Sequence, residues 1–356
     1  MALRDAKLLF DIAVRLQVFA EGVKITEARI FDLLLIAVED EFKDIIGRIK
    51  YDTLDALTKR ELNKLVVALR ESQSKLYSLY LDKVLKRLEL FMRASLKVQR
   101  ISYASAHFFL ADDLEEPSLM QDEDAAAYIE VENVKNTFTA LFGLLAIKKG
   151  GDTLWPKIVN EPIPSNGALL KPFLTSFMAS AQVNVENILR KGYANALTPN
   201  QTAAEAVKQI NKIKGQASSV MATSMQHIAS VVSASITSAL YGRYRWISVI
   251  DGSTTDICLS RNHRIYEYGR GPIPPAHNGC RSSIEPYNGN REPETFYSWV
   301  KRQSPFMQNF ALGNKGGELL RTEKLKAKDV TRLTDPKAMT VETFANSARQ
   351  IITGEE

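Results

Sequence analysis

The sequence predicts a mainly α-helical protein: a long helical N-terminal arm and a helical bundle, followed by a small α+β C-terminal module with a short β-hairpin and loop motif. Two observations predict this fold class. Apolar residues recur at three- and four-residue steps along much of the first 245 residues, which is the period of one helix face. From Trp246 onward, a short β-prone run precedes a loop rich in Pro, Gly, Cys and His.

Length and composition limit the class of protein. The chain of 356 residues is long enough for two domains, and its net charge of +5 fits either an acidic or nucleic-acid partner or an ordinary solvated surface. No apolar run approaches the roughly 20 residues of a membrane span, and the N-terminus lacks the apolar core of a signal peptide. With only two cysteines, a secreted disulfide-rich fold is not expected. These features predict a protein that is made and kept in a cytoplasm.

Residues 1–110 are expected to form the helical arm. Thr58 and Glu61 have the spacing of a capping box, which starts a helix. An apolar stripe follows at helical spacing: Leu62, Leu65, Val66, Leu69, Leu76, Leu79, Val84, Leu88 and Phe91. Because neither Pro nor Gly occurs between Gly47 and Pro117, we expect one long helix or two stacked helices.

Residues 111–124 predict an acidic linker. They contain 7 Asp and Glu residues and no Lys or Arg, and Pro117 interrupts any helix. Like charges at this density repel each other, so the segment is not expected to pack. A metal site built from these acids is the less favoured alternative, because nothing in the pattern fixes their geometry.

Residues 125–245 are expected to form a helical bundle. A Pro- and Gly-containing loop from Trp155 separates its first helix from one that ends at Gly192. Thr198 and Pro199 then supply an N-cap and a first helical residue for a helix that is expected to stop at Gly215. An Ala/Ser/Thr-rich helix follows. His227, in that helix, is expected to be an ordinary core or surface histidine and not a ligand.

The segment after Trp246 carries the chemically informative residues. Cys258, His277 and Cys280 supply two thiols and one imidazole, and His-x-x-Cys is a spacing at which both side chains can reach one tetrahedral ion. A structural zinc ion would need a fourth ligand from water or from one of three residues: Asp251, Asp256 or His263. A metal-free thiol pair beside the histidine and a disulfide are the other interpretations.

A catalytic interpretation of the same residues is less favoured. A Cys–His pair can act as a nucleophile with its base, and a metal-bearing loop can serve a nuclease. However, no oxyanion-hole signature, phosphate-cradling loop or paired-carboxylate motif accompanies Cys258 and His277. Arg281 could contact a phosphate or a carboxylate, but a structural ion pair within the loop is the simpler expectation. The sequence therefore predicts a protein that is not an enzyme.

The order of these residues resembles the signature of the phage Mu F-like minor head proteins. The matching positions of the first block are Trp246, Asp251, Thr255, Cys258, Pro275, His277, Cys280 and Arg281. A second block, with Trp299, Gln303 and Gly313, is similar to the Trp- and Gln-containing helices that follow the motif in this family, and its second short helix is expected to end at Gly313. Many members have further cysteines where this chain has Arg261 and Ser282. The chain therefore resembles the cysteine-poor branch, and the likeness covers about residues 195–345.

The resemblance implies a role in head morphogenesis, DNA packaging or DNA ejection, inside the capsid near the portal vertex. The implied partners are the phage portal protein, the major capsid or scaffolding protein and packaged double-stranded DNA, with several copies in the virion. It also divides the end of the chain into a Mu F-like C-terminal module, 246–335, and a tail, 336–356. No cofactor is expected to be required, although a structural zinc ion is compatible with the loop.

Charge agrees in direction with this expectation. Residues 241–332 contain 15 Lys and Arg against 9 Asp and Glu, a balance of +6. The alternatives are a metal-dependent nuclease or hydrolase built on Cys258, His277 and Cys280, and a DNA-binding virion protein that is ejected with the genome.

Overall fold

The computed structural model describes residues 2–108, 150–238, 241–249, 254–287, 289, 294–325, 339–340 and 342–343. These residues are mainly helical, with a small three-stranded antiparallel sheet near the C-terminal end, so the predicted fold class is confirmed. The predicted acidic linker and the first helix of the predicted bundle lie outside the described residues, as does most of the predicted tail. No described helix combines the length and the apolar character needed to cross a membrane.

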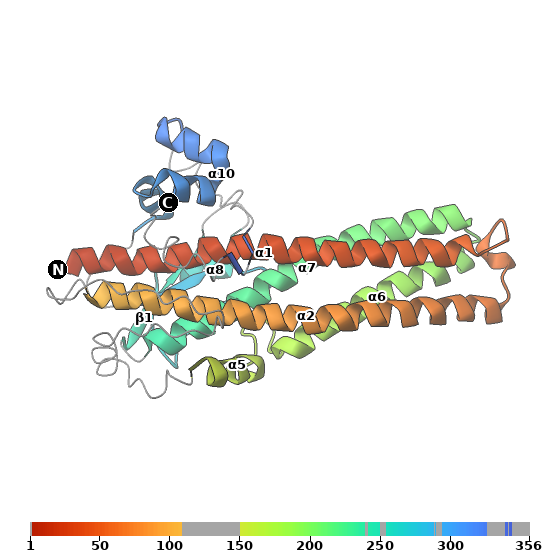
Figure 1. Cartoon of the computed structure of the whole chain (residues 1–356), viewed down its shortest axis with the longest axis horizontal. Helices are drawn as coiled ribbons and strands as arrows, with labels where there is room; N and C mark the ends of the chain where they lie inside the picture. The colour runs from red at the N-terminus through yellow and green to blue at the C-terminus, as the bar shows by residue number, and fades with distance from the viewer. Residues whose placement is uncertain are drawn as a thin grey trace.

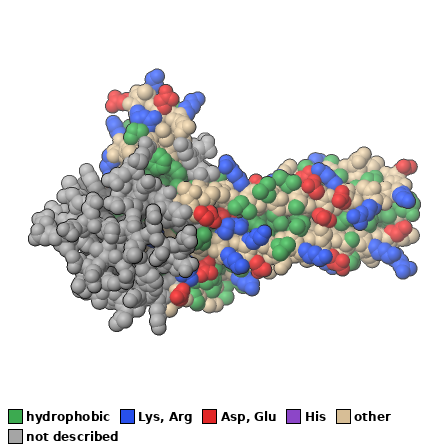
Figure 2. Space-filling view, in the orientation of Figure 1, with side chains coloured by type: hydrophobic (Ala, Val, Ile, Leu, Met, Phe, Trp, Pro, Cys, Tyr) green, Lys and Arg blue, Asp and Glu red, His purple; other side chains and the backbone are tan. Residues whose placement is uncertain are grey.

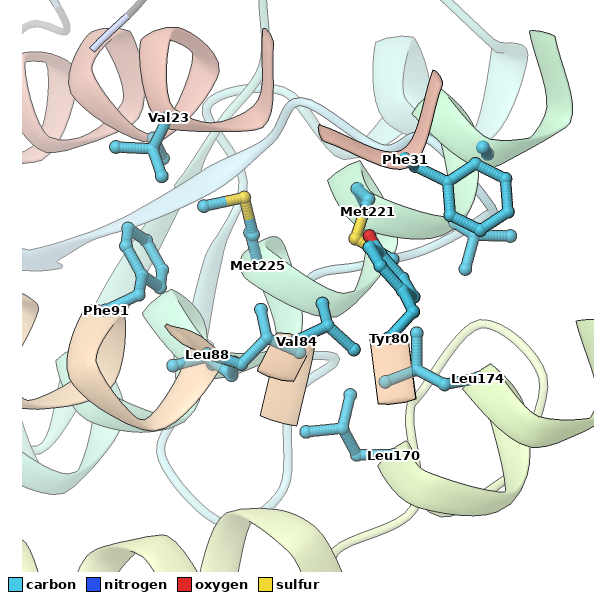
Figure 3. Close-up of a cluster of buried hydrophobic side chains, with 14 of the residues drawn as sticks. Val23, Phe31, Tyr80, Val84, Leu88, Phe91, Leu170, Leu174, Met221 and Met225 are labelled. Carbon is cyan, nitrogen blue, oxygen red and sulfur yellow. The ribbon is translucent and has the colours of Figure 1, made fainter. Parts of the chain in front are cut away.

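Helices α1, α2, α6 and α7 form an elongated bundle (Figure 1). Their bounds are Ala2–Gly47, Lys59–Phe108, Leu170–Ala194 and Pro199–Thr237. The short helix α5 (Gly150–Asn160) packs against α2, α6 and α7. Buried apolar side chains from the bundle helices meet in a continuous core, part of which Figure 3 shows: Val23, Phe31, Val84, Leu88, Leu170, Leu174, Met221 and Met225.

Two predicted helix starts, at Thr58 and Thr198, are confirmed, whereas α7 runs on through the start expected after Gly215. The Thr58 backbone N–H donates to the Glu61 carboxylate at 2.8 Å, and the Glu61 N–H donates to the Thr58 hydroxyl at 3.2 Å. Thr198 and Gln201 form a second capping box at the start of α7. Because each box satisfies two backbone groups that the helix leaves open, the first turns of α2 and α7 are fixed locally.

Two predicted helix ends and the start of one predicted loop are wrong. Gly215 lies inside α7, which continues to Thr237 because its buried face packs against α1 and α6. Gly192 lies inside α6, and a Cβ there would come within 2.6 Å of the Thr202 hydroxyl, so glycine serves close helix packing and not a cap. Pro156 lies within α5, where the sequence predicted a loop.

The two helical hairpins meet at the free end of the bundle. A short 3-10 helix, η1 (Leu54–Ala56), follows α1, and the Leu54 N–H donates to the Leu197 carbonyl in the turn between α6 and α7 at 2.9 Å. The Leu54 side chain is fully buried beside Gly192. The turn between α1 and α2 is therefore anchored to the turn between α6 and α7.

The first half of α1 is buried on nearly every face. Residues 9–23 are almost entirely buried, because the helix lies between α2, α7 and β3, with the C-terminal helices packed on its remaining side (Figure 1). The aromatic ring of Phe19 contacts the ring of Phe310, and the two ring centroids are 5.1 Å apart. A helix that is apolar all round is one that the fold encloses.

Asp11 is one of the buried polar residues on this helix. Its carboxylate accepts hydrogen bonds from the Trp299 indole at 2.7 Å, from the Gln303 amide at 3.0 Å and from Arg15 at 2.8 Å. Trp299 is fully buried and Gln303 is 7% exposed. The start of the chain is thus bonded to a helix that lies 288 residues further along.

The C-terminal helices are α9 (Phe296–Lys301) and α10 (Pro305–Arg321). Within α10, Gly313 has a φ of 71° and a ψ of 164°, so the helix breaks there as the sequence predicts. One hydrophobic core joins α1 and α2 to α7 and to these helices. The division into the units 1–110, 125–245 and 246–335 stays a prediction.

The sheet has the strand order β2-β1-β3 in the part of the chain that is described. The strands are β1 (Arg243–Ile247), β2 (Ile265–Glu267) and β3 (Ser283–Tyr287), all antiparallel. The strand expected to begin at Trp246 begins at Arg243, because residues 243–245 pair with β2 on one side and with β3 on the other. Pairing on both sides holds these three residues in a strand although two of them are arginines.

Replacing Asp11 by alanine should lower the free energy of unfolding by about 3 kcal/mol, because it leaves a buried indole N–H and a cationic partner without their acceptor. Urea denaturation followed by tryptophan fluorescence measures this loss. Asp40→Ala, at an exposed position of the same helix, is the matched control and should change little. Equal losses in the two variants would show that Asp11 does not join α1 to α9.

His227 should make stability depend on pH. It is 1% exposed, its Nε2 lies 3.2 Å from the Ile158 carbonyl, and burial lowers its pKa from the usual 6.5. The unfolded chain therefore binds the proton more readily, so stability is lost as the pH falls below about 6.5. Between about pH 7.5 and about pH 5.5, the melting temperature of the wild type should fall further than that of His227→Gln. Parallel profiles would contradict a buried neutral imidazole.

Candidate metal centre

Cys258, His277 and Cys280 come together although two separate segments supply them. Cys258 lies on α8 (Asp256–Arg261), and the other two lie in the loop before β3. The Cys258 Sγ is 3.2 Å from the His277 Nε2 and 3.7 Å from the Cys280 Sγ. The three ligand atoms all lie within 4.8 Å of one another, so the group can hold a metal ion.

Two of the three distances between ligand atoms are close to those around a tetrahedral zinc ion. With Zn–S bonds of about 2.3 Å and Zn–N bonds of about 2.0 Å, tetrahedral geometry places ligand atoms about 3.5 to 3.8 Å apart. The sulfur–sulfur distance of 3.7 Å falls in this range, and the sulfur–nitrogen distance of 3.2 Å is slightly shorter. Both cysteines are free thiols and buried, while His277 is half-buried. The histidine side of the group therefore faces the surface.

The histidine is oriented for ligation through Nε2. Its Nδ1 lies 2.9 Å from the Asn278 carbonyl oxygen, which can only accept, so Nδ1 carries the proton. The lone pair of a neutral imidazole is then on Nε2, toward the two sulfur atoms. Such a hydrogen bond from the second ring nitrogen is the usual support of a metal-binding histidine.

The surroundings of Cys258 favour its thiolate. A hydrogen bond from Cys280 lowers the pKa of Cys258 to about 5 against the opposing effect of burial, and the Ser282 and Thr255 hydroxyl groups add to the lowering. The same hydrogen bond and deep burial raise the pKa of Cys280. A divalent cation at this position would bind both sulfur atoms as thiolates, because it takes the place of the proton that the two thiols share.

Trp246 and Ser248 hold the group against the sheet. The fully buried Trp246 side chain packs against Cys258 and Cys280, and its indole N–H donates to the Ser248 hydroxyl at 2.9 Å. That hydroxyl donates in turn to the Cys258 carbonyl at 2.9 Å. The Arg261 guanidinium covers the outer side of the indole ring, 5.1 Å from its centroid.

The loop that carries His277 and Cys280 is anchored to α7 and to the sheet. The Gly279 N–H donates to the Thr223 hydroxyl of α7 at 2.8 Å, and Gly279 has a φ of 74°, which favours glycine. Nearby, the Tyr244 hydroxyl donates to the Pro272 carbonyl at 2.6 Å. Tertiary contacts, and not the spacing of the motif alone, therefore bring the two ligands to Cys258.

The remaining predicted motif residues lie around this frame. Thr255 precedes α8 as its N-cap, without a side-chain cap hydrogen bond, and Pro275 is buried after a cis peptide bond. The Arg281 carbonyl accepts from Gln17 of α1. The ion pair predicted for the Arg281 side chain stays a prediction. Asp251 lies outside the described residues.

Two of the residues considered as a fourth ligand lie outside the group. Asp256 and His263 are described, and neither belongs to the group around Cys258. His263 has its backbone N–H bonded to the Trp246 carbonyl at 2.8 Å, and burial together with the charge of Arg245 lowers the pKa of its side chain. Among the described residues, the group thus offers three protein ligands.

Three residues that support the fold and the site were not predicted from the sequence: Asp11, Ser248 and Thr223. Asp11 had a local signal, since it interrupts the apolar run of Leu9, Phe10 and Ile12. Ser248 is likewise a polar residue within a β-prone run. Such interruptions show that a polar group is needed, but they do not identify the partner, which in each case is distant in the sequence.

Comparison with protein-family models, with curated proteins and with solved structures finds no match to this chain.

Proposed function

We propose that this chain is a minor head protein of a tailed bacteriophage that acts in head morphogenesis, DNA packaging or DNA ejection, and that it is not an enzyme. The observation that carries the proposal is the ordered motif from Trp246 to Gly313, which resembles the Mu F-like family. Its side chains serve packing: Trp246 and Trp299 are fully buried. Residues used in this way suit an assembly component better than a catalyst.

The architecture supports the same role. The elongated bundle and the compact group of β-strands and short helices beside α1 lie at different parts of the molecule (Figure 1). Such a shape can contact two partners at once, here the portal protein and the capsid or scaffolding protein. Several copies at the portal vertex, inside the virion, follow from the resemblance.

The test of this function uses the portal protein encoded in the same genome. Co-expressed with the tagged portal protein, the chain should be retained on it, and particles made without the chain should package or deliver DNA poorly. Packaging and infectivity are measured as DNA content and plaque yield. Normal particles without the chain, together with no retention on the portal, would overturn the proposal.

We further propose that Cys258, His277 and Cys280 hold a structural zinc ion, with the fourth position open to water or to another ligand. The ion would link α8 to the loop before β3, because those two segments carry the ligands. Its contribution would be cross-linking and not chemistry, since a metal ion that ties two separate segments together stabilises a fold. The metal-free thiol pair and the disulfide are the rival states.

Purified protein should contain about one zinc ion per chain by elemental analysis. Cys258→Ser, Cys280→Ser and His277→Asn should each lose it and melt at a lower temperature, because the link between α8 and the loop is broken. His263→Asn is the matched control, since it removes a nearby histidine outside the group. Two titratable thiols without metal would favour the thiol pair, and no titratable thiol would favour the disulfide.

The same preparations separate the structural role from a nuclease. Plasmid DNA incubated with the zinc-loaded protein should stay intact. Metal-dependent nicking that disappears in His277→Ala would replace the structural interpretation by a catalytic one.

A further inference from the structure

The free end of the bundle is a distinct surface, which we call the bundle tip. It consists of residues 48–64, which connect α1 to α2 and begin α2, and residues 187–214, which end α6 and begin α7. The hydrogen bond from the Leu54 N–H to the Leu197 carbonyl holds the two parts side by side. The tip lies at the opposite end of the bundle from the sheet (Figure 1).

The bundle tip concentrates positive charge. It contains 10 Lys and Arg against 4 Asp and Glu, a balance of +6 in a chain whose net charge is +5. All of these cations except the half-buried Lys214 are exposed: Arg48, Lys50, Lys59, Arg60, Lys64, Arg190, Lys191, Lys208 and Lys212. Figure 2 shows Lys and Arg side chains at this end of the bundle.

Two of the tip's carboxylates are already engaged. Glu61 accepts from the backbone N–H and the hydroxyl group of Thr58, as part of the capping box. Glu205 pairs with Lys208 at 2.6 Å, and this hydrogen bond lowers its pKa, with smaller contributions from the charges of Lys212 and Lys191. The α6 and α7 lysines therefore gather around one acid, and the tip keeps an excess of six positive charges.

The tip has little exposed apolar surface. Among the described residues of the tip, Tyr51 is the one large hydrophobic residue that is exposed, with 42% of its surface accessible to solvent. Leu33 and Leu79 are exposed along the middle of the bundle. Stable protein interfaces depend on buried aromatic and aliphatic anchors. A row of exposed cations without such anchors suits the phosphates of a nucleic-acid backbone, which binds by charge and counterion release.

We propose that the bundle tip binds the phosphate backbone of double-stranded DNA without reading its base sequence. The choice of DNA among polyanions rests on the proposed function in the phage head, whereas the location at the tip rests on charge and exposure alone. Cations from both hairpins would contact the duplex together, since the Leu54–Leu197 hydrogen bond fixes their relative position.

Fluorescence anisotropy of a labelled duplex of arbitrary sequence tests this proposal with the full chain. The double variant K208E/K212E should bind at least tenfold more weakly than the wild type. Because each lost phosphate contact reduces the salt exponent by about 0.9, the loss of affinity between about 50 and about 200 mM salt should also shrink by about tenfold. K75E/K83E, at exposed positions in the middle of α2, makes the same change of net charge and should retain wild-type salt dependence.

Equal weakening in both double variants would overturn the tip as the site, because net charge alone would then explain binding. A preference for duplex RNA, or retention of an acidic protein in place of DNA, would overturn the choice of partner. Circular dichroism and melting temperature verify that each variant folds. If the wild type binds portal protein but not DNA, this inference fails and the proposed function stands. If it binds DNA through the tip, while the portal does not retain it and particles made without it are normal, the proposed function fails and the inference stands.

Discussion

The burial of the first half of α1 on almost all of its faces constrains the rest of the structure. Its first half contacts the bundle, strand β3 and the C-terminal helices, so each of those parts is positioned by the same surface. Asp11 makes this contact specific. An apolar helix alone would tolerate sliding or rotation of α9, whereas a carboxylate that must accept from Trp299 and Gln303 permits one register.

The position of Cys258, His277 and Cys280 depends on that arrangement indirectly. β3 pairs with β1, and β1 carries Trp246, on which both cysteines pack. Beneath them, the buried pair of Arg245 and Glu285 faces across the same two strands, with side-chain exposures of 4% and 0%. Charges so deeply enclosed are costly unless their surroundings stay in place. The sheet therefore has little freedom to shift, which keeps Cys258 within reach of His277 and Cys280.

The two ends of the bundle are built by different physical rules. Near the sheet, polar side chains are buried or half-buried and matched to particular partners, as Thr223 and Ser248 show. At the bundle tip, the backbone is fixed by capping boxes and by Leu54, while the charged side chains extend into solvent. This separation suits a protein that must keep a fixed shape and also bind a large anion. Changing the surface charge at the tip leaves the core intact.

The amino-acid sequence by itself determined the features that depend on neighbouring residues. These are the helical period, the capping boxes at Thr58 and Thr198, the break at Gly313 and the gathering of candidate ligands in one segment. Only the tertiary structure decided that α7 runs through Gly215, that Gly192 serves close packing, and that Asp11 bonds to Trp299. The reason is the range of the interactions involved. Caps and turns are satisfied within a few residues, whereas the cost of a glycine inside a helix or of a buried carboxylate is offset by partners that the fold brings from far along the chain.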